Sequence, residues 1–248
     1  MFDVHPGCLN RIAAVVRLIA STGATQSGRE QLASSFHLCS PPKLSPDTHI
    51  VQDLSDWFTD AIETIPQLNY PYPVPPFTFG WPVNQTCKTL ASGAGADAGA
   101  EADMPADGNA VAALLAAASE ITASFYGSGN TSQCFDGVGQ GGIPGGGPVP
   151  NMVQDPTDHA WGYQSCTETL HKFSGRGVRN FSFELAPVAA VCADTFNAEP
   201  DFDWPGVHYG GYGIPAGLTG ASNIIFSEGL LDPWHGGGFL KQVSGGTV

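Results

Sequence analysis

Residues 222–238 read SNIIFSEGLLDPWHGGG, and this stretch decides how the rest of the sequence is interpreted. The apolar run Ile224–Phe226, rich in β-branched residues, predicts a short strand. A loop then passes through Gly229 and presents Asp232, ahead of Trp234 and three glycines. Open α/β sheets bind their ligands at the carboxyl ends of the strands. The stretch therefore predicts a catalytic acid, Asp232, at the end of a late strand.

The partners that such an acid needs in a serine-type mechanism are not evident in the sequence. No serine lies in a G-x-S-x-G turn, where the nucleophile of this arrangement is found. The one histidine that follows Asp232 is His235, which shares a tight loop with the acid and has little room for the geometry of a base. We therefore expect one member of a triad, in a chain that is inactive alone. The alternative for Asp232 is a turn aspartate before proline.

The composition excludes several classes of partner. Nine Lys and Arg against 23 Asp and Glu give a net charge of −14, which argues against nucleic acid as a partner. No run approaches the ~18 apolar residues that a membrane helix needs, so no membrane span is expected. Residues 1–10 lack the basic and apolar regions of a signal peptide.

Six cysteines are spread along the chain, at positions 8, 39, 87, 134, 166 and 192, and no C-x-x-C occurs. Zinc sites favour short ligand spacings, so we expect no metal and no cofactor. We interpret the cysteines as three disulfides formed in an oxidising compartment. N-x-S/T sequons at Asn84, Asn130 and Asn180 agree with glycosylation there. Such chemistry without a signal peptide predicts a missing N-terminal segment.

Helical signals dominate the rest of the chain. Apolar residues at helical spacing predict a helix at residues 8–21, the Ala-rich run at 109–126 predicts a second, and a short helix is expected at 183–195. A further helix is expected from its N-cap at Ser45 to Pro66, with Trp57 on the buried face. The segment NYPYPVPP at residues 69–76 cannot form regular structure, because its prolines remove donors and fix φ. The expected disordered inserts are residues 91–108 and 137–150.

Five ordered stretches resemble the serine carboxypeptidase family that contains lysosomal Pro-Xaa carboxypeptidase and dipeptidyl peptidase II. They are HLCSP at 37–41, NYPYP at 69–73, NTSQC at 130–134, WGYQSCTE at 161–168, and the stretch 222–238. The resemblance implies a helical (SKS-like) cap domain and an α/β-hydrolase domain. We therefore expect a mainly α fold with a small α/β part. Residues 1–200 are the expected disulfide-stapled cap region, and residues 201–248 a C-terminal remnant of the hydrolase domain.

The resemblance also implies a function, a serine-type exopeptidase that cleaves next to proline by acyl-enzyme chemistry. Asp232 matches the triad acid and Trp234 a residue that lines the proline pocket. His171 stands where that pocket usually has an apolar side chain. The implied disulfides are Cys8–Cys87, Cys39–Cys134 and Cys166–Cys192. Proline-containing peptides are the implied partners, in a lysosome, a vacuole or the secretory route, and the intact parent enzyme could be a homodimer.

Three further side chains are candidates for the substrate pocket. Trp161 and Tyr163 could form an aromatic floor for a proline ring, and core packing is the alternative for both. Glu168 could read a charged peptide terminus, or it could be a paired structural carboxylate. His208 is interpreted as a surface or pocket residue. The alternative for the chain as a whole is a non-catalytic, truncated peptide-binding module.

Overall fold

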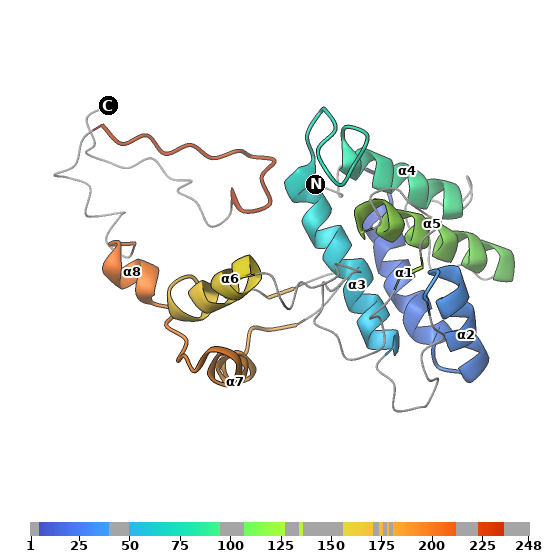
Figure 1. Ribbon diagram of the computed structural model, residues 1–248. Coiled ribbons are helices and arrows are strands. Elements are labelled where there is room, and N and C mark those ends of the chain that lie inside the picture. Colours follow the sequence, from blue (N-terminus) through green and yellow to red (C-terminus); the bar gives the residue numbers. More distant parts are fainter. Residues whose placement is uncertain are drawn as a thin grey trace. The chain divides into compact units, whose positions relative to one another are not determined.

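The computed structural model describes residues 5–39, 50–94, 107–126, 134–135, 156–170, 174–175, 178, 181–211 and 223–235 (Figure 1). The chain divides into two compact units, Met1–Val149 and Pro150–Val248. These described residues are mainly helical, as predicted, and their only β-pairing is in two isolated bridges, Leu38–Phe135 and Gly175–Phe181. The predicted domain boundary between residues 200 and 201 stays a prediction.

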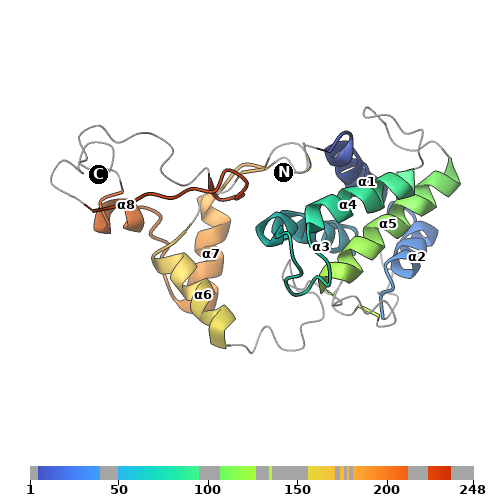
Figure 2. The same ribbon diagram turned by 90° about the horizontal axis from the view of Figure 1, so that it is seen from above.

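The first unit is a helical bundle. Its elements are α1 (Cys8–Thr22), α2 (Gln26–Ser35), α3 (Ile50–Thr64), the 3-10 turn η2 (Ile65–Leu68), α4 (Pro82–Ala94) and α5 (Gly108–Tyr126). Helices α4 and α5 lie side by side, and α1 packs against both of them and against α3 (Figure 2). The largest fully buried side chains all come from this unit: Phe36, Phe58, Ile12, Ile19, Leu32, Ile50, Leu54, Ile65, Leu90, Leu114, Leu115 and Val15.

Local sequence signals account for the longest of these helices. The helices predicted at residues 8–21 and 109–126 are confirmed as α1 and α5, within one residue at each end. Trp57 is 2% exposed on α3, as its predicted face requires. The α-helix ends at Thr64, because Pro66 lies at the start of η2. The predicted cap, Ser45, lies outside the described residues.

Helix α4 corrects one expectation. Residues 91–94 were assigned to a disordered insert, but α4 continues through them to Ala94. The cause is packing against α5 rather than local propensity. A Cβ added at Gly93 would lie 2.7 Å from Cβ of Ala117 and 2.8 Å from the backbone O of Ala113, so the absent side chain lets the two helices approach closely. At the other end of that insert Gly108 already belongs to α5, whereas residues 95–106, and the insert at 137–150, lie outside the described residues.

Helix α5 is, among the described helices, the one long and apolar enough to cross a membrane by length and composition. However, Leu115, Ala118 and Thr122 are fully buried in the bundle, where α5 packs against α3 and α4. A core helix passes the same test of length and composition, so the test is weak evidence for a membrane span.

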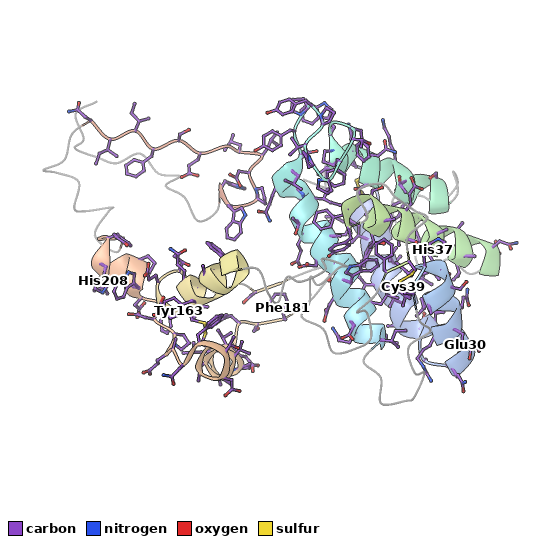
Figure 3. The ribbon with its side chains drawn as sticks, viewed as in Figure 1. Glu30, His37, Cys39, Tyr163, Phe181 and His208 are labelled. Carbon is purple, nitrogen blue, oxygen red and sulfur yellow. A yellow bond between two sulfur atoms is a disulfide. The ribbon has the colours of Figure 1, made fainter. Side chains whose placement is uncertain are left out.

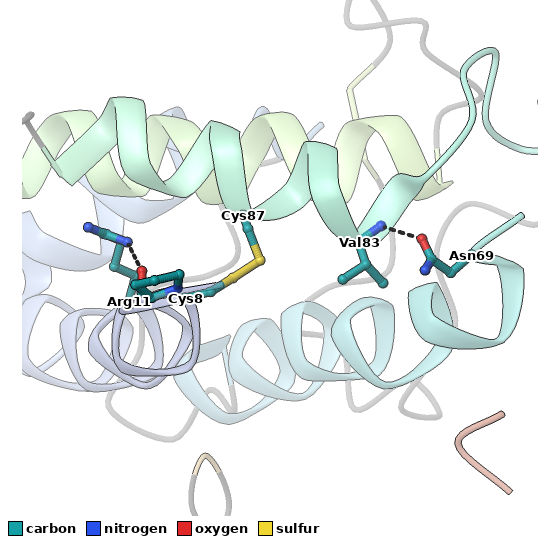
Figure 4. The surroundings of a disulfide bond; sticks show 6 residues. Cys8, Arg11, Asn69, Val83 and Cys87 are labelled. Carbon is teal, nitrogen blue, oxygen red and sulfur yellow. Dashed lines mark hydrogen bonds between the residues drawn. A yellow bond between two sulfur atoms is a disulfide. The ribbon is translucent and has the colours of Figure 1, made fainter. Parts of the chain in front are cut away.

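Two disulfides hold the first unit together, and both are pairs that the resemblance implies. Cys8–Cys87 joins the start of α1 to α4, with both cysteines at most 5% exposed (Figure 4). Cys39–Cys134 joins the segment that follows α2 to the short described segment at residues 134–135. There the backbone N–H of Phe135 donates to the carbonyl O of His37 at 2.8 Å, and that of Cys39 donates to Phe135 O at 2.8 Å.

The second unit contains a disulfide-linked helix pair. Its helices are α6 (Pro156–Thr167), α7 (Leu185–Phe196) and the short α8 (Trp204–His208), and α7 confirms the helix predicted at 183–195. The third implied disulfide, Cys166–Cys192, joins α6 to α7. Gly162 permits their close approach, because a Cβ there would lie 2.6 Å from Cζ of Phe196.

The predicted strand Ile224–Phe226 is wrong for the structure as described. These residues carry no regular secondary structure, and Ile224 and Ile225 are 54% and 87% exposed. A strand is stable only when its backbone groups pair with a neighbouring strand and its apolar side chains are covered. No such neighbouring strand occurs among the described residues, so the β-propensity of this run alone does not produce a strand.

Candidate catalytic site

The loop that carries the predicted acid is a hydrogen-bonded turn. The backbone N–H of Asp232 donates to the carbonyl O of Gly229 at 2.8 Å, which closes the turn over Leu230 and Leu231. The carboxylate oxygen Oδ1 of Asp232 accepts a hydrogen bond from the backbone N–H of Trp234 at 2.8 Å. This is an Asx-turn, which fixes the direction of a short acidic side chain. The turn therefore fixes the Asp232 carboxylate next to the backbone of Trp234.

The exposure of this loop leaves both predicted side chains accessible. Asp232 is exposed and the Trp234 side chain is 47% exposed. Leu230 and Leu231, which precede the acid, are 80% and 66% exposed. A carboxylate held by one backbone N–H and otherwise open can accept a further hydrogen bond from an imidazole N–H. The catalytic role of Asp232 stays a prediction.

His235 does not face the carboxylate of Asp232. Its ring nitrogen Nδ1 contacts the backbone O of Asp232, and its backbone N–H donates to the same oxygen at 3.1 Å. A base oriented by Asp232 would instead place a ring N–H against the carboxylate. The geometry therefore agrees with the expectation that His235 is not the base.

The aromatic candidates Trp161 and Tyr163 are surface residues of α6. They are 59% and 51% exposed, which argues against complete burial in the core of the second unit. The rings of Tyr163, labelled in Figure 3, and Phe196 on α7 form a T-shaped pair, with centroids 6.2 Å apart and the planes at 76°. Their place in a substrate pocket stays a prediction.

Glu168 follows directly after α6. Its backbone N–H donates to the carbonyl O of Gln164 at 2.8 Å, and its side chain is half-buried rather than buried. The neighbouring Cys166 is 5% exposed, and its carbonyl O accepts from the N–H of Asp201 at 3.1 Å. The disulfide therefore fixes the position of the WGYQSCTE motif in the second unit.

Of the remaining candidate residues, the structure describes His208 and Asn84. His208 is exposed on α8, where its ring stacks on Trp204 with centroids 3.6 Å apart (Figure 3). Asn84 lies in the first turn of α4 and is half-buried. His171, Asn130 and Asn180 lie outside the described residues.

One polar contact that the sequence reasoning missed gives the NYPYP motif a structural role. Oδ1 of Asn69 accepts a hydrogen bond from the backbone N–H of Val83, 14 residues later, at 3.1 Å (Figure 4). Side-chain oxygens usually cap a helix from the residue at its own start. An asparagine before a proline-rich loop was the only local signal, and it does not reveal which helix the side chain caps.

A small cavity lies in the first unit, and none of the predicted pocket residues lines it. Its volume is about 50 Å³, enough for a few water molecules. The lining residues come from η2, α4, α5 and the loop before α4: Ile65, Phe77, Phe79, Gln85, Thr86, Thr89, Glu120, Ile121 and Ser124. Among the residues with described side chains, no group of three or more His, Cys, Asp and Glu could hold a metal ion.

Comparisons with known proteins identify the family. The sequence matches the family described as serine carboxypeptidase S28 over residues 1–248. It is similar to the lysosomal Pro-X carboxypeptidases of Mus musculus and Homo sapiens, with 25% and 26% identity over 253 residues. These alignments cover 96% of this chain and 43% of each relative.

A nematode protein gives a similar result. The prolyl carboxy peptidase like protein 5 of Caenorhabditis elegans is 28% identical over 249 residues, covering 90% of this chain and 42% of the relative. The chain thus spans less than half the length of these relatives. Because the family match extends over the whole sequence, the chain belongs to the serine carboxypeptidase S28 family.

Proposed function

We propose that Asp232 is the acid of a Ser-His-Asp triad in a serine-type exopeptidase that cleaves next to proline. The observation that carries this proposal is the turn in which Trp234 N–H holds the Asp232 carboxylate at 2.8 Å. It couples the acid to an exposed tryptophan, whose flat apolar face suits a proline ring. Membership of the serine carboxypeptidase family supports the same assignment.

The role of Asp232 follows from the chemistry of acyl transfer. A serine attacks the peptide carbonyl, a histidine takes the serine proton and passes it to the leaving amine, and the acid orients the imidazole and stabilises its cation. A carboxylate in the third position supplies neither the nucleophile nor the oxyanion donors. Since the sequence has no serine in a G-x-S-x-G turn, we propose that these 248 residues hydrolyse no peptide by themselves.

The substrate and the compartment are part of the same proposal. The relatives are named as lysosomal Pro-X carboxypeptidases, which supports peptides with proline before the scissile bond and release of the C-terminal residue. Three disulfides support an oxidising compartment such as a lysosome or the secretory route. Release of an N-terminal dipeptide is the competing specificity, because the resemblance extends to dipeptidyl peptidases.

The first experiment is carried out on the native protein. An antibody against residues 69–76 captures the protein from its source. The captured protein is deglycosylated and its molecular mass is measured. It is also treated with a fluorophosphonate, which labels active serine nucleophiles. We expect a polypeptide larger than 25.8 kDa, the mass of these 248 residues, that is labelled and releases phenylalanine from a blocked Pro-Phe dipeptide. An unlabelled 25.8 kDa species would instead favour the non-catalytic peptide-binding module.

The assignment of Asp232 is tested by a matched pair of variants in the protein as its own gene encodes it. Asp232→Asn should lower kcat by about 10⁴, because an amide favours the wrong imidazole tautomer, and leave KM nearly unchanged. Asp201→Asn is the control, since Oδ1 of Asp201 also accepts a backbone N–H two residues later, from Asp203 at 3.0 Å, in an exposed turn. Equal activity of the two variants would refute the proposal.

A further inference from the structure

The loop between η2 and α4, residues 69–81, is fixed at both ends although it has no regular secondary structure. We call it the aromatic loop. The backbone N–H of Trp81 donates to the carbonyl O of Tyr70 at 2.6 Å, and Asn69 holds Val83 as described above. Gly80 passes so close to Pro71 that an added Cβ would lie 2.5 Å from the Pro71 carbonyl O. The two ends of the loop are therefore clamped together.

The middle of the aromatic loop is anchored in the core of the first unit. Phe77 is 5% exposed, and its ring lies near those of Phe79 and Phe125, with centroids 5.4 and 6.2 Å away. Its backbone N–H donates to the carbonyl O of Val74 at 2.9 Å. Four prolines restrict the remaining backbone angles. A loop ordered in this way before binding loses little conformational entropy when a ligand arrives.

Three large aromatic side chains of this ordered loop nevertheless face solvent. Tyr70, Tyr72 and Trp81 are 44%, 56% and 46% exposed. The rings of Tyr70 and Tyr72 stack with centroids 5.5 Å apart and planes at 26°. Single exposed aromatic residues are ordinary, but several gathered on one fixed element are typical of an interaction surface.

The backbone of Trp81 adds a second observation. Its φ is 56°, in the left-handed region that bulky residues rarely adopt. Strained residues of this kind persist where the surroundings determine them, and they cluster at ligand clamps. Here the strained residue has a half-exposed indole, and its backbone N–H is held by Tyr70 O, so the strain accompanies a side chain at the surface rather than a buried one.

The charge of the loop indicates the class of ligand. Residues 65–83, IPQLNYPYPVPPFTFGWPV, contain no charged side chain in a chain of net charge −14. The polar groups that the exposed rings offer are the phenol hydroxyls and the indole N–H, which can donate hydrogen bonds. An uncharged ligand that exposes unpaired carbonyl acceptors and flat apolar rings fits this set. A proline-rich segment in the polyproline II conformation has both.

We propose that the aromatic loop is a docking surface for uncharged, proline-rich peptide segments, with Tyr72 and Trp81 as its main contacts. The surface is made only of residues of the first unit and needs neither Asp232 nor Trp234. It therefore goes beyond the proposed catalytic role and can hold a peptide whether or not that peptide is cleaved. A second copy of the chain is a poor occupant, because two chains of net charge −14 repel each other.

The test uses the protein as its own gene encodes it and a defined probe. Isothermal titration calorimetry measures binding of acetyl-(Pro)10-amide, with acetyl-(Gly-Ser)5-amide as the uncharged control peptide. We expect saturable binding of the proline peptide alone. Tyr72→Ala should weaken it by about tenfold or more, the loss usual for a central aromatic contact. Tyr72→Phe should lose less, because it keeps the ring. Tyr209→Ala removes a tyrosine that is 74% exposed in the second unit and should change nothing.

The outcomes separate this proposal from the catalytic one. Asp232→Asn should leave proline-peptide binding unchanged, so that loss of the triad assignment would not affect the docking surface. No saturable binding at millimolar peptide, or equal affinity of Tyr72→Ala and the parent chain, would overturn the proposal. A large drop in the melting temperature of Tyr72→Ala without peptide binding would also overturn it, since the ring would then be packed within the protein. Dimerisation that Tyr72→Ala abolishes, again without peptide binding, would assign the surface to self-association.

Discussion

The side chain of Asn69 caps helix α4 from 14 residues away, with Oδ1 accepting the backbone N–H of Val83 at 3.1 Å. The residue at the start of the helix, Trp81, has φ of 56° and no side-chain oxygen with which to cap it. Asn69 therefore satisfies one of the N–H groups that a helix start leaves unpaired. The same contact fixes the entrance of the aromatic loop.

Asn69→Ala should lower the free energy of unfolding by about 1 kcal/mol, the usual cost of losing a helix cap. Denaturant unfolding followed by far-UV circular dichroism measures this change. Asn69→Asp keeps an oxygen acceptor at the same place and should retain most of the stability. If both variants unfold at the same denaturant concentration as the parent chain, the cap contributes nothing.

A second prediction concerns the close contact of α4 with α5. Gly93→Ala would insert a methyl group between Ala117 and the backbone of Ala113, and it should destabilise the chain by about 1–3 kcal/mol through overpacking. Gly108→Ala, in the first turn of α5, is the matched control because nothing lies within 4 Å of the added Cβ. Thermal unfolding should show a lower midpoint for the first variant and an equal or higher midpoint for the second. The reverse order would mean that the helices move apart without cost.

The environment of Tyr126 leads us to predict that the free energy of unfolding falls at high pH. Its hydroxyl donates to the carbonyl O of Trp57 at 3.0 Å and lies 3.3 Å from Oδ2 of Asp60. Burial, and next the negative charge of Asp60, raise the pKa of Tyr126 above its ordinary value of 10.0. Above pH 10 the unfolded phenol loses its proton while the folded one keeps it. The free energy of unfolding should therefore fall with pH, by up to about 1.4 kcal/mol per unit.

The measurement is the pH dependence of urea unfolding from pH 8 to 11. Tyr126→Phe should remove this part of the slope and cost about 1 kcal/mol below pH 10, from the lost hydrogen bond. Tyr209→Phe, at a tyrosine that is 74% exposed, should keep the parent slope. An unchanged slope in Tyr126→Phe would assign the pH dependence to other groups.

The parts of the fold that the sequence predicted are those governed by local sequence signals. Apolar residues at helical spacing predicted α1 and an Ala-rich composition predicted α5, and both helices lie where these signals place them. The disulfide pairs came from the family resemblance, because spacing alone leaves 15 pairings of six cysteines open. The contacts that were missed are non-local, namely the hydrogen bond by which Asn69 caps α4 and the close contact of Gly93 with α5.

The candidate site shows the same division. The turn that joins Asp232 to Trp234 follows from short-range chemistry, an aspartate accepting the N–H two residues later. The strand expected at Ile224–Phe226 does not form in the described structure, because a strand is defined by its neighbour and not by its own residues. The exposure of Trp161 and Tyr163 could not be predicted either, because a sequence pattern gives no measure of how much of a side chain a neighbouring helix covers.

The exposure of the three disulfides predicts the order of their reduction. Cys39 and Cys134 are exposed, whereas the other four cysteines are at most 5% exposed. Thiol–disulfide exchange requires a thiolate to reach a sulfur atom. Increasing dithiothreitol, followed by alkylation and peptide mass spectrometry, should therefore label Cys39 and Cys134 first. The double variant Cys39→Ser/Cys134→Ser should show no early labelling and keep its other two bridges at the same dose. Simultaneous labelling of all six cysteines would mean that the chain unfolds globally before any bridge is attacked.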